Sequence, residues 1–191
     1  MNEQHLVFCA SDDWRRIVHD TILPVALRGV ELGDDAIEIG PGPGFTTDVL
    51  RTMTTRLTAV EVDEVLAASL SERLAGGNVD VVLGDATALE YPDDRFTGAA
   101  SFHMLHHIAP AAQQDRVFAE LARVLVPGGL LVAADAGYRE ATVAFHEGDT
   151  YNPIEAEDLA GRLEAAGFGD VDVRTHELGW VCTARAQAAG G

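Results

Sequence analysis

Short apolar runs alternate with amphipathic segments along most of this chain. Five runs have the length and composition of buried strands, at residues 36–40, 57–62, 79–83, 98–102 and 130–134. Segments with apolar positions three and four residues apart follow several of them, at residues 46–54, 64–74, 111–125 and 154–166. Strands that alternate with helices are typical of an α/β domain built on a parallel sheet. Two further runs, at 171–176 and 180–185, are predicted to be the last two strands.

The first 33 residues precede this alternation and are predicted to form a helical cap. Ser11 is a good helix N-cap, and the two aspartates that follow it supply acids to the first turn. Apolar residues then recur at helical spacing until Pro24, which should kink or interrupt the helix. A chain of 191 residues suits a single domain, which we take to be residues 1–191 with residues 1–33 as its cap.

Three glycines on alternate positions, Gly40, Gly42 and Gly44, separate the first strand from the helix that follows it. Glycine permits a sharp turn and leaves no Cβ between the backbone and a ligand. The first amides of the following helix have no intrahelical partners, so a polar or anionic group can bind there. The pattern indicates a strand–loop–helix nucleotide site, although such turns also simply join strands to helices.

An acid at the end of the second strand strengthens this interpretation. Glu61 lies 21 positions after Gly40, which is about the interval at which a βαβ unit returns an acid to the ribose hydroxyls. The dinucleotide fingerprint places its third glycine five positions after the first, where this chain has Phe45. This departure argues against a nicotinamide cofactor.

Three later motifs complete a pattern that resembles a known enzyme family. The third strand ends in Gly84-Asp85-Ala86, the fourth runs through residues 101–103 into a Leu-His-His turn, and Pro127-Gly128-Gly129 precedes the fifth. In this order and at these spacings, the motifs resemble the class I S-adenosylmethionine-dependent methyltransferases, in particular their small-molecule, type 11-like branch. The resemblance covers about residues 34–185.

The resemblance implies a fold and a place for the N-terminal segment. The fold would be a Rossmann-like, doubly wound, seven-stranded α/β sheet, mostly parallel, with helices on both faces. Its last strand would be antiparallel and inserted beside the fifth. In such proteins the N-terminal segment often covers the pocket, so His5, Cys9 and Trp14 could face the site. A helix that only packs on the sheet explains the same pattern equally well.

The resemblance also implies S-adenosyl-L-methionine as the cofactor and suggests which residues bind it. The glycine-rich loop would lie against the methionine part through Gly40, Pro41, Gly42 and Gly44. Glu38, on the strand just before the loop, would help to hold the amino group directly or through water. Alternatively, Glu38 is a partly buried acid that caps nearby loop amides.

The nucleoside would be held at the ends of the second and third strands. Glu61 would accept hydrogen bonds from both ribose hydroxyls, whereas alternation along the strand points Asp63 elsewhere. A Glu61→Ala change should therefore weaken cofactor binding and leave the stability of the ligand-free fold almost unchanged. Val62 would pack on the adenine ring. Asp85 would accept a hydrogen bond from the exocyclic amine of adenine, and the Ala86 amide would donate one to a ring nitrogen. Alternatively, Asp85 is a turn aspartate whose side chain hydrogen-bonds the backbone of its own turn.

The end of the fourth strand would line the reaction centre. Ser101 and Phe102 are expected to lie against the cofactor, and His103 is the candidate base for an acceptor that must lose a proton. His103 and His107 could share one face at helical spacing, but no third ligand or supporting acid follows at a fixed spacing. We therefore predict no metal site, with His106 and His107 packing and hydrogen bonding under the loop.

Charge and composition exclude several other classes of function. Acids outnumber bases 31 to 13, and the net charge of −18 argues against a nucleic-acid partner. Every base is arginine, so the chain lacks a Walker lysine, a pyridoxal Schiff-base lysine and the Tyr-x-x-x-Lys pair of short-chain dehydrogenases. Cys9 and Cys182 form neither a disulfide framework nor a metal-site spacing. Apolar runs stay shorter than a membrane span, and residues 1–5 lack a basic signal-peptide start.

Together these features predict a cytoplasmic S-adenosylmethionine-dependent methyltransferase that acts on an O, N, C or S atom of a small-molecule acceptor. We expect no nucleic-acid or membrane partner, and a homodimer is one option. Two alternatives stay open: a cofactor-binding but non-catalytic methyltransferase-like subunit or regulator, and an aminopropyl transferase on the same scaffold. The second would need acids near the end of the fourth strand, where residues 101–103 offer none.

Overall fold

The computed structural model describes residues 2–188 of the chain. Met1 and residues 189–191 lie outside the described residues, and so do the two ends of the predicted domain 1–191 and the first residue of the predicted cap 1–33. Among residues 2–188, no helix combines the length and the apolar character that crossing a membrane requires.

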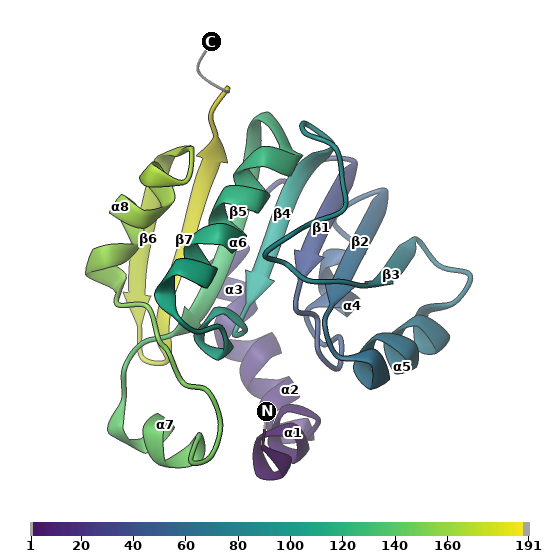
Figure 1. Ribbon diagram of the computed structural model, residues 1–191. Helices are drawn as coiled ribbons and strands as arrows, with labels where there is room; N and C mark the ends of the chain where they lie inside the picture. Colours follow the sequence, from purple (N-terminus) through teal and green to yellow (C-terminus); the bar gives the residue numbers. More distant parts are fainter. Residues whose placement is uncertain (1, 189–191) are drawn as a thin grey trace.

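Within the described residues, seven strands form one sheet in the order β3-β2-β1-β4-β5-β7-β6 (Figure 1). The strands are β1 (Asp35–Ile39), β2 (Arg56–Glu61), β3 (Val79–Leu83), β4 (Phe96–Phe102), β5 (Leu125–Ala136), β6 (Phe168–His176) and β7 (Gly179–Ala186). Strands β1 to β5 pair in parallel, whereas β7 lies between β5 and β6 and runs antiparallel to both. The predicted Rossmann-like sheet, with its last strand inserted beside the fifth, is confirmed.

The order of the strands determines where a ligand can bind. Strand β1 pairs with β2 on one side and with β4 on the other, so the chain reverses its direction of winding between β1 and β4. Ile39, at the end of β1, lies opposite Val60 and Ser101 in the two neighbouring strands. In doubly wound sheets the crevice at such a reversal, outside the carboxyl ends of the strands, is the usual ligand site.

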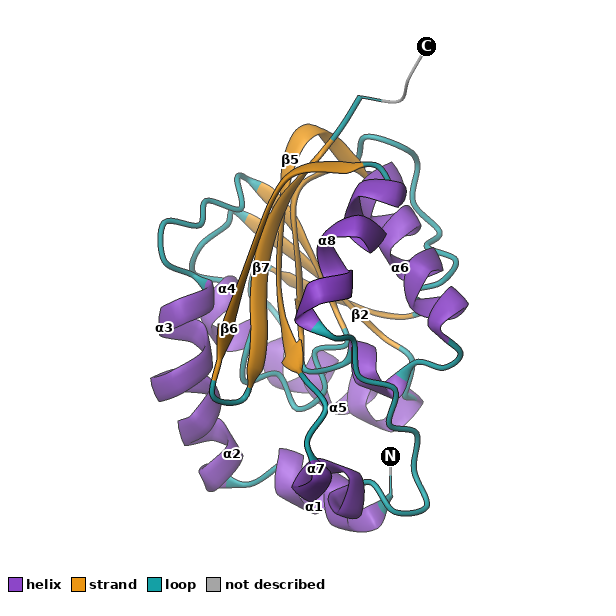
Figure 2. Cartoon of the chain, turned by 90° about the vertical axis from the view of Figure 1, so that its left-hand side faces the viewer, coloured by secondary structure: helices purple, strands orange, loops and turns teal. Residues whose placement is uncertain are grey.

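Helices cover both faces of the sheet, as Figure 2 shows. One face carries α6 (Ala111–Val124) and α8 (Ala156–Ala165). The opposite face carries α2 (Asp12–Ile17), the π-helix η1 (Val18–Ile22), α3 (Leu23–Ala26) and α4 (Thr47–Leu50). The helix α5 (Glu64–Leu74) packs against β2 and β3. Because both faces are covered, the central strand β1 is buried at every position instead of alternating between buried and exposed residues.

Each face of the sheet has its own apolar cluster. Phe118 and Trp180 belong to the cluster under α6 and α8, whereas Phe102 and Val181 belong to the cluster under η1 and α3. Trp180 is fully buried, and its indole N–H donates to the Ile154 carbonyl at 2.8 Å. The large aromatic side chain therefore fills the core without leaving its donor unpaired.

The N-terminal cap differs in detail from the prediction. Ser11 caps α2 as expected, since its hydroxyl accepts a hydrogen bond from the Trp14 amide. The α-helix is interrupted just before Pro24, as expected, because the wider π-helical turn at 18–22 separates α2 from α3, which contains the proline near its start. An additional helix, α1 (Glu3–Cys9), lies before Ser11 and was not predicted.

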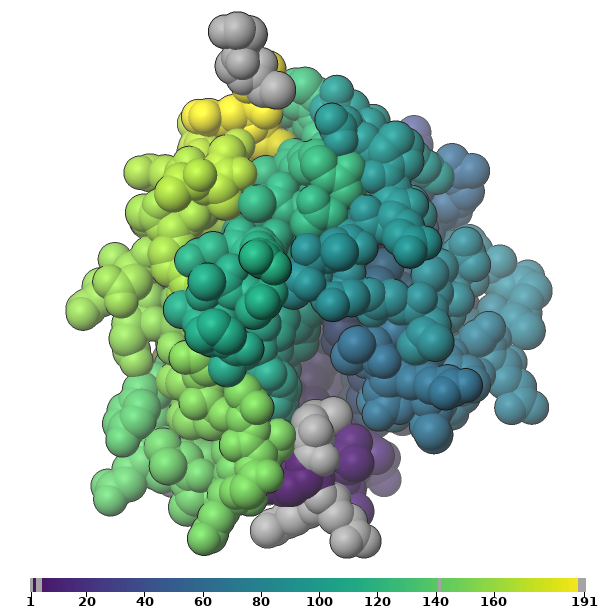
Figure 3. Space-filling model, in the orientation of Figure 1, coloured from purple at the N-terminus to yellow at the C-terminus, as the bar shows by residue number. Residues whose placement is uncertain are grey.

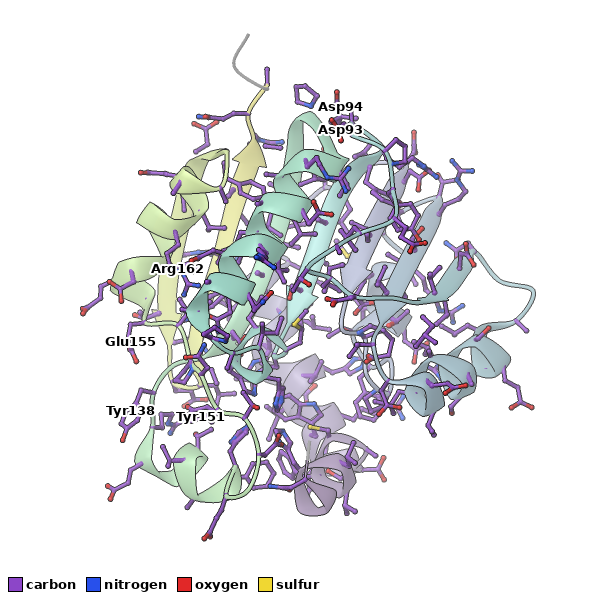
Figure 4. All side chains as sticks on the ribbon, viewed as in Figure 1. Asp93, Asp94, Tyr138, Tyr151, Glu155 and Arg162 are labelled. Carbon is purple, nitrogen blue, oxygen red and sulfur yellow. The ribbon has the colours of Figure 1, made fainter. Side chains whose placement is uncertain are left out.

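Three short elements lie together at the carboxyl edge of the parallel strands: α1, the 3₁₀ helix η2 (Leu105–His107) and α7 (Glu140–Phe145). The Asn2 side-chain amide donates to the carbonyls of Phe145 and Glu147 at 3.3 and 3.2 Å, which ties the start of the chain to the end of α7. Tyr138 and Tyr151 lie at this end of the molecule, opposite the turn that carries Asp93 (Figure 4).

Candidate active site

A cavity of about 1210 Å³ opens at the carboxyl ends of β1 to β4. Ligand pockets commonly measure roughly 300–1,000 Å³, so this one has room for more than one small ligand. The strand ends and their loops form one part of its wall, and several helices, among them α1, α2, η2 and α7, contribute to the rest. In Figure 3 the surface is hollowed between the purple N-terminal segment and the blue α5 region. His5, Cys9 and Trp14 all lie in the cavity wall.

The Glu61 carboxylate joins the end of β2 to the glycine-rich loop. Oε2 accepts the Gly42 amide at 2.9 Å, and Oε1 accepts the amides of Val62 and Asp63 at 2.9 and 3.1 Å. The side chain is 5% exposed and lines the cavity. A carboxylate has about four lone-pair sites, so three are already used by the backbone. A pair of ribose hydroxyls would have to share or replace the Gly42 bond.

These three hydrogen bonds argue against the expectation that Glu61→Ala leaves the stability of the ligand-free fold almost unchanged. Removal of the Glu61 carboxylate would leave three backbone amides without their acceptor, and unpaired amides in a partly buried site destabilise the fold. Glu61→Ala should therefore loosen the loop even when no ligand is bound. Asp63 also lines the cavity, and its side chain accepts the Val65 and Leu66 amides at the start of α5.

Gly42 and Gly44 of the loop have different structural roles. Gly42 has a φ of +53°, and a Cβ there would meet nothing within 4 Å, so this position borders open space in the cavity. Gly44 has a φ of +88°, and a Cβ there would lie 2.4 Å from both Leu70 Cδ1 and Arg73 Nη2. Gly44 is buried against α5 and does not belong to the cavity wall, unlike Gly40 and its neighbour Pro41. Gly44 thus has a packing role, and its cofactor contact stays a prediction.

The predicted nucleoside residues meet at one end of the cavity. Val62, Asp85 and Ala86 line the wall beside Glu61, and Val62 is 73% exposed. Asp85 Oδ1 accepts the amide and the hydroxyl of Thr87, both at 2.8 Å, so the alternative turn role of Asp85 is present. An apolar side chain between two carboxylates provides a surface for a ring and acceptors for hydroxyl and amino groups. The residues at this end thus fit an adenosine group.

Glu38 and Ser101 lie behind the cavity wall. Each side chain is 1% exposed, and neither residue is among those that line the cavity. Glu38 Oε1 accepts the Thr46 hydroxyl, while Oε2 and the Ser101 hydroxyl have no hydrogen-bond partner among the described residues. Burial raises the pKa of Glu38 to about 7. The neighbouring Phe102 and the loop line the cavity, so contact of Glu38 with the cofactor, directly or through water, and contact of Ser101 stay predictions.

His103 lies in the cavity wall directly after β4 and adopts a left-handed backbone conformation, with a φ of +51°. Its amide donates to the Ala134 carbonyl at 2.8 Å, and its ring packs edge-on against Trp14 with 5.1 Å between the ring centroids. Burial lowers the pKa of His103 to about 4, and Nε2 has no hydrogen-bond partner within residues 2–188. The ring is therefore neutral at pH 7 rather than poised to titrate there.

His106 is held by Asp135, a buried acid at the carboxyl end of β5. Asp135 contacts His106 Nδ1 with one oxygen and accepts the His106 amide with the other at 3.0 Å. Burial alone would raise the pKa of Asp135, but the charge and hydrogen bond of His106 lower it overall. Asp135 directly follows the strand predicted at residues 130–134, so the sequence already places it near the carboxyl edge of the sheet. Only the fold shows that it pairs with His106.

Four imidazoles gather where α1, η2 and α7 meet. His5, His106, His107 and His146 each offer one ligand atom, and these atoms lie within 4.8 Å of one another. His103 and His107 do not share one face of a helix, as their spacing had suggested, because a bend and a 3₁₀ turn take the place of that helix. The residues that join His106 and His107 in the cluster are His5 and His146. These two lie 141 positions apart, and no local sequence pattern indicates that they meet.

Comparison with known sequences identifies the chain's relatives. Residues 37–133 match the family model described as a methyltransferase domain, type 11. A Mycobacterium tuberculosis protein described as a "probable S-adenosylmethionine-dependent methyltransferase" is 30% identical over 144 residues, which is 72% of this chain and 49% of that protein. The ribosomal RNA small subunit methyltransferase A of Deinococcus radiodurans is 43% identical over 63 residues, 33% of this chain and 22% of the relative. The match thus spans half or less of either relative.

Solved structures share the fold at low sequence identity. A protein from Pyrococcus horikoshii aligns with a TM-score of 0.79 and 16% identity, covering 94% of both chains. A chain from a complex that contains the Haloferax volcanii Trm112 methyltransferase activator aligns with a TM-score of 0.73 and 16% identity, covering 98% of this chain and 100% of that one. The sheet, the loop geometry and the family match agree. This chain belongs to the type 11 methyltransferase domain family of class I S-adenosylmethionine-dependent methyltransferases.

Proposed function

We propose that this protein transfers a methyl group from S-adenosyl-L-methionine to a small-molecule acceptor. One observation carries the proposal: a single cavity of about 1210 Å³ contains the nucleoside-binding end and, beyond His103, a second end walled by α1 and α7. The first end accounts for the cofactor, and the second leaves room for a compact acceptor. Methyl transfer needs the two ligands side by side, and one shared cavity would hold them so.

The chain's own residues would orient the cofactor. The loop at Gly40–Gly42 would lie against its methionine part, Glu61 would accept from the ribose, and Val62, Asp85 and Ala86 would surround the adenine. The cofactor supplies a methyl group on a sulfonium sulfur, which is already an activated donor. The protein then has to position the acceptor and exclude water, and Phe102 and His103 lie where the methyl group would point.

The size and charge of the site favour a small acceptor over RNA. Within residues 2–188, eight arginines pair with carboxylates, namely Arg16, Arg51, Arg56, Arg73, Arg95, Arg123, Arg162 and Arg174. Because the net charge is −18, a phosphate backbone would be repelled over most of the surface. These observations support a small molecule without excluding RNA.

A ribosomal RNA substrate is the second candidate, because the Deinococcus radiodurans relative is named for that reaction. The expectation of no nucleic-acid partner, made from net charge, is therefore not supported by the comparisons. An activator subunit is a related option, since one similar structure comes from a complex with the Trm112 activator. The aminopropyl alternative gains no support, because the buried Asp135 is engaged by His106 and by the Ala136 amide.

Transfer of a radiolabelled methyl group separates these candidates. The full chain would be incubated with labelled S-adenosylmethionine and, in parallel, with a metabolite extract below a few kilodaltons, with ribosomal RNA and with protein from the same cells. We expect label in the metabolite fraction and in neither macromolecular fraction. Label in RNA alone would replace the small-molecule proposal with the second candidate. Tight cofactor binding without transfer to any fraction would favour the non-catalytic alternative.

A further inference from the structure

The four-histidine cluster lies in the part of the cavity away from the nucleoside residues. His5 comes from α1, His106 and His107 from η2, and His146 directly follows α7. His5, His106 and His146 are 4%, 4% and 5% exposed, so the imidazoles are shielded from bulk water. Their ring centroids pack closely, with His5 4.7 Å from His107 and 4.4 Å from His146. Three separate segments thus bring the same type of ligand to one point.

Two of these rings are fixed through Nδ1, as metal ligands are. His106 Nδ1 contacts the Asp135 carboxylate, and His146 Nδ1 is 2.7 Å from the Thr142 carbonyl, to which it can only donate. Donation through Nδ1 places the acceptor lone pair on Nε2 and fixes the ring plane. Metal-bound histidines typically donate their other ring nitrogen to a carboxylate or a backbone carbonyl in this way.

Several nitrogens of the cluster lack the partner that a buried polar atom normally has. His146 Nε2, His107 Nδ1 and His5 Nδ1 have no hydrogen-bond partner in the part of the chain that the structure describes. His5 Nδ1 lies 3.5 Å from an Asp149 carboxylate oxygen, which is within ion-pair range but long for a hydrogen bond. Buried polar atoms in native proteins are nearly always satisfied, so an orphaned group calls for an unplaced ion or water.

The type of side chain indicates which cation would bind. Histidine ligates a metal through its neutral imidazole. Neutral imidazoles are preferred ligands of zinc, copper, nickel and iron rather than of magnesium or calcium.

From this geometry we propose that His5, His106, His107 and His146 bind one zinc-class divalent metal ion. Tetrahedral zinc with Zn–N bonds of about 2.0–2.1 Å places its nitrogens about 3.3 Å apart. The present separations of up to 4.8 Å would then close by about 1.5 Å, within reach of side-chain rotation and a small movement of α1. The ion would clamp α1 and α7 onto η2 and thereby close the acceptor end of the cavity.

Titration of the full-length, tag-free protein with Co²⁺ and Zn²⁺ tests this site without any methyl acceptor. After treatment with a chelator, we expect one Co²⁺ per chain, with visible absorption of a four-coordinate nitrogen site that Zn²⁺ displaces. Binding should also raise the unfolding temperature, because the ion binds only the folded cluster. Absence of stoichiometric binding by the wild-type chain would overturn the proposal. So would a thiolate charge-transfer band, which would place the ion on Cys9 instead.

Substitutions assign the ligands. His5→Gln and His146→Gln should each weaken Zn²⁺ binding by at least about 10-fold, the lower end of the cost of losing even an outer-shell partner. His19→Gln and His176→Gln are matched controls, because these histidines lie outside the cluster, and they should bind as the wild type does. Retained cofactor binding shows that a variant is folded. If both cluster variants bind Zn²⁺ as tightly as the wild type, the ligand assignment is rejected. If a variant fails to fold, the stoichiometry and the Co²⁺ spectrum of the wild-type protein decide whether the site exists.

Discussion

The Glu61 carboxylate accepts the Gly42 amide across 2.9 Å and so fastens the glycine-rich loop to the end of β2. The acid that the sequence assigns to the ribose is therefore also a structural element of the loop. Ligand binding and loop geometry share one side chain, and a substitution there has two separable effects.

The first effect is on stability. Glu61→Ala removes the acceptor of three amides, so we expect a loss of about 1–3 kcal/mol in the free energy of unfolding without ligand. Glu61→Gln keeps one acceptor oxygen and should lose less. Chemical denaturation of both variants, monitored by circular dichroism, measures the difference. Equal stability of the wild type and Glu61→Ala would show that the loop does not depend on these bonds.

Two glycine substitutions should separate the packing of the loop from its contact with ligand. Gly44→Ala places a methyl group 2.4 Å from Leu70 and Arg73 atoms, so we expect a marked fall in the unfolding temperature, as overpacking costs about 1–3 kcal/mol beyond the backbone strain. Gly42→Ala carries only the strain, because its methyl group enters open cavity. It should weaken cofactor binding more than it lowers stability. A larger loss of stability for Gly42→Ala would contradict these roles.

The buried Glu38 should make stability depend on pH. Burial raises its pKa from 4.5 in the unfolded chain to about 7 in the folded one. Between these values the folded state keeps a proton that the unfolded state has lost, so stability falls as pH rises from about 4.5 to about 7 and then levels off. The loss is on the order of 3 kcal/mol. Glu38→Gln should abolish this fall, whereas Glu72→Gln, at an exposed position, should keep it; an unchanged slope in Glu38→Gln would contradict the shift.

The sequence was sufficient for features that local patterns determine. Buried strands, the glycine-rich loop and the acid at Glu61 follow from spacing and residue type alone. The sequence did not reveal that Glu38 and Ser101 turn behind the cavity wall, because their burial depends on the register between neighbouring strands. Nor could it reveal the pairing of His5 with His146, since only the tertiary fold brings two such distant short helices together. Helices as short as α1 and α7 also carry little periodic signal, although Asn2 caps α1.

His103 can be tested as a base once an acceptor is known. The sequence makes this ring the candidate base, and burial lowers its pKa to about 4. Protonation of His103 should therefore leave the wild-type rate unchanged near pH 7 and lower it only as the pH approaches 4. His103→Gln should reduce turnover by about 10²–10⁴-fold if the acceptor loses a proton in the reaction, with the cofactor dissociation constant unchanged. Near-normal turnover across the pH range would leave His103 only a role in shaping the cavity.

Calorimetric binding of S-adenosylhomocysteine tests the central claim, that the loop and Glu61 hold the nucleoside of this cofactor. The wild-type chain should bind S-adenosylhomocysteine more tightly than NAD. Glu61→Gln retains an acceptor for the loop but loses the charge, so its affinity should fall by about 1.5–3 kcal/mol, or roughly 10- to 150-fold. Unchanged affinity in Glu61→Gln, or tighter binding of NAD by the wild type, would contradict the proposed site.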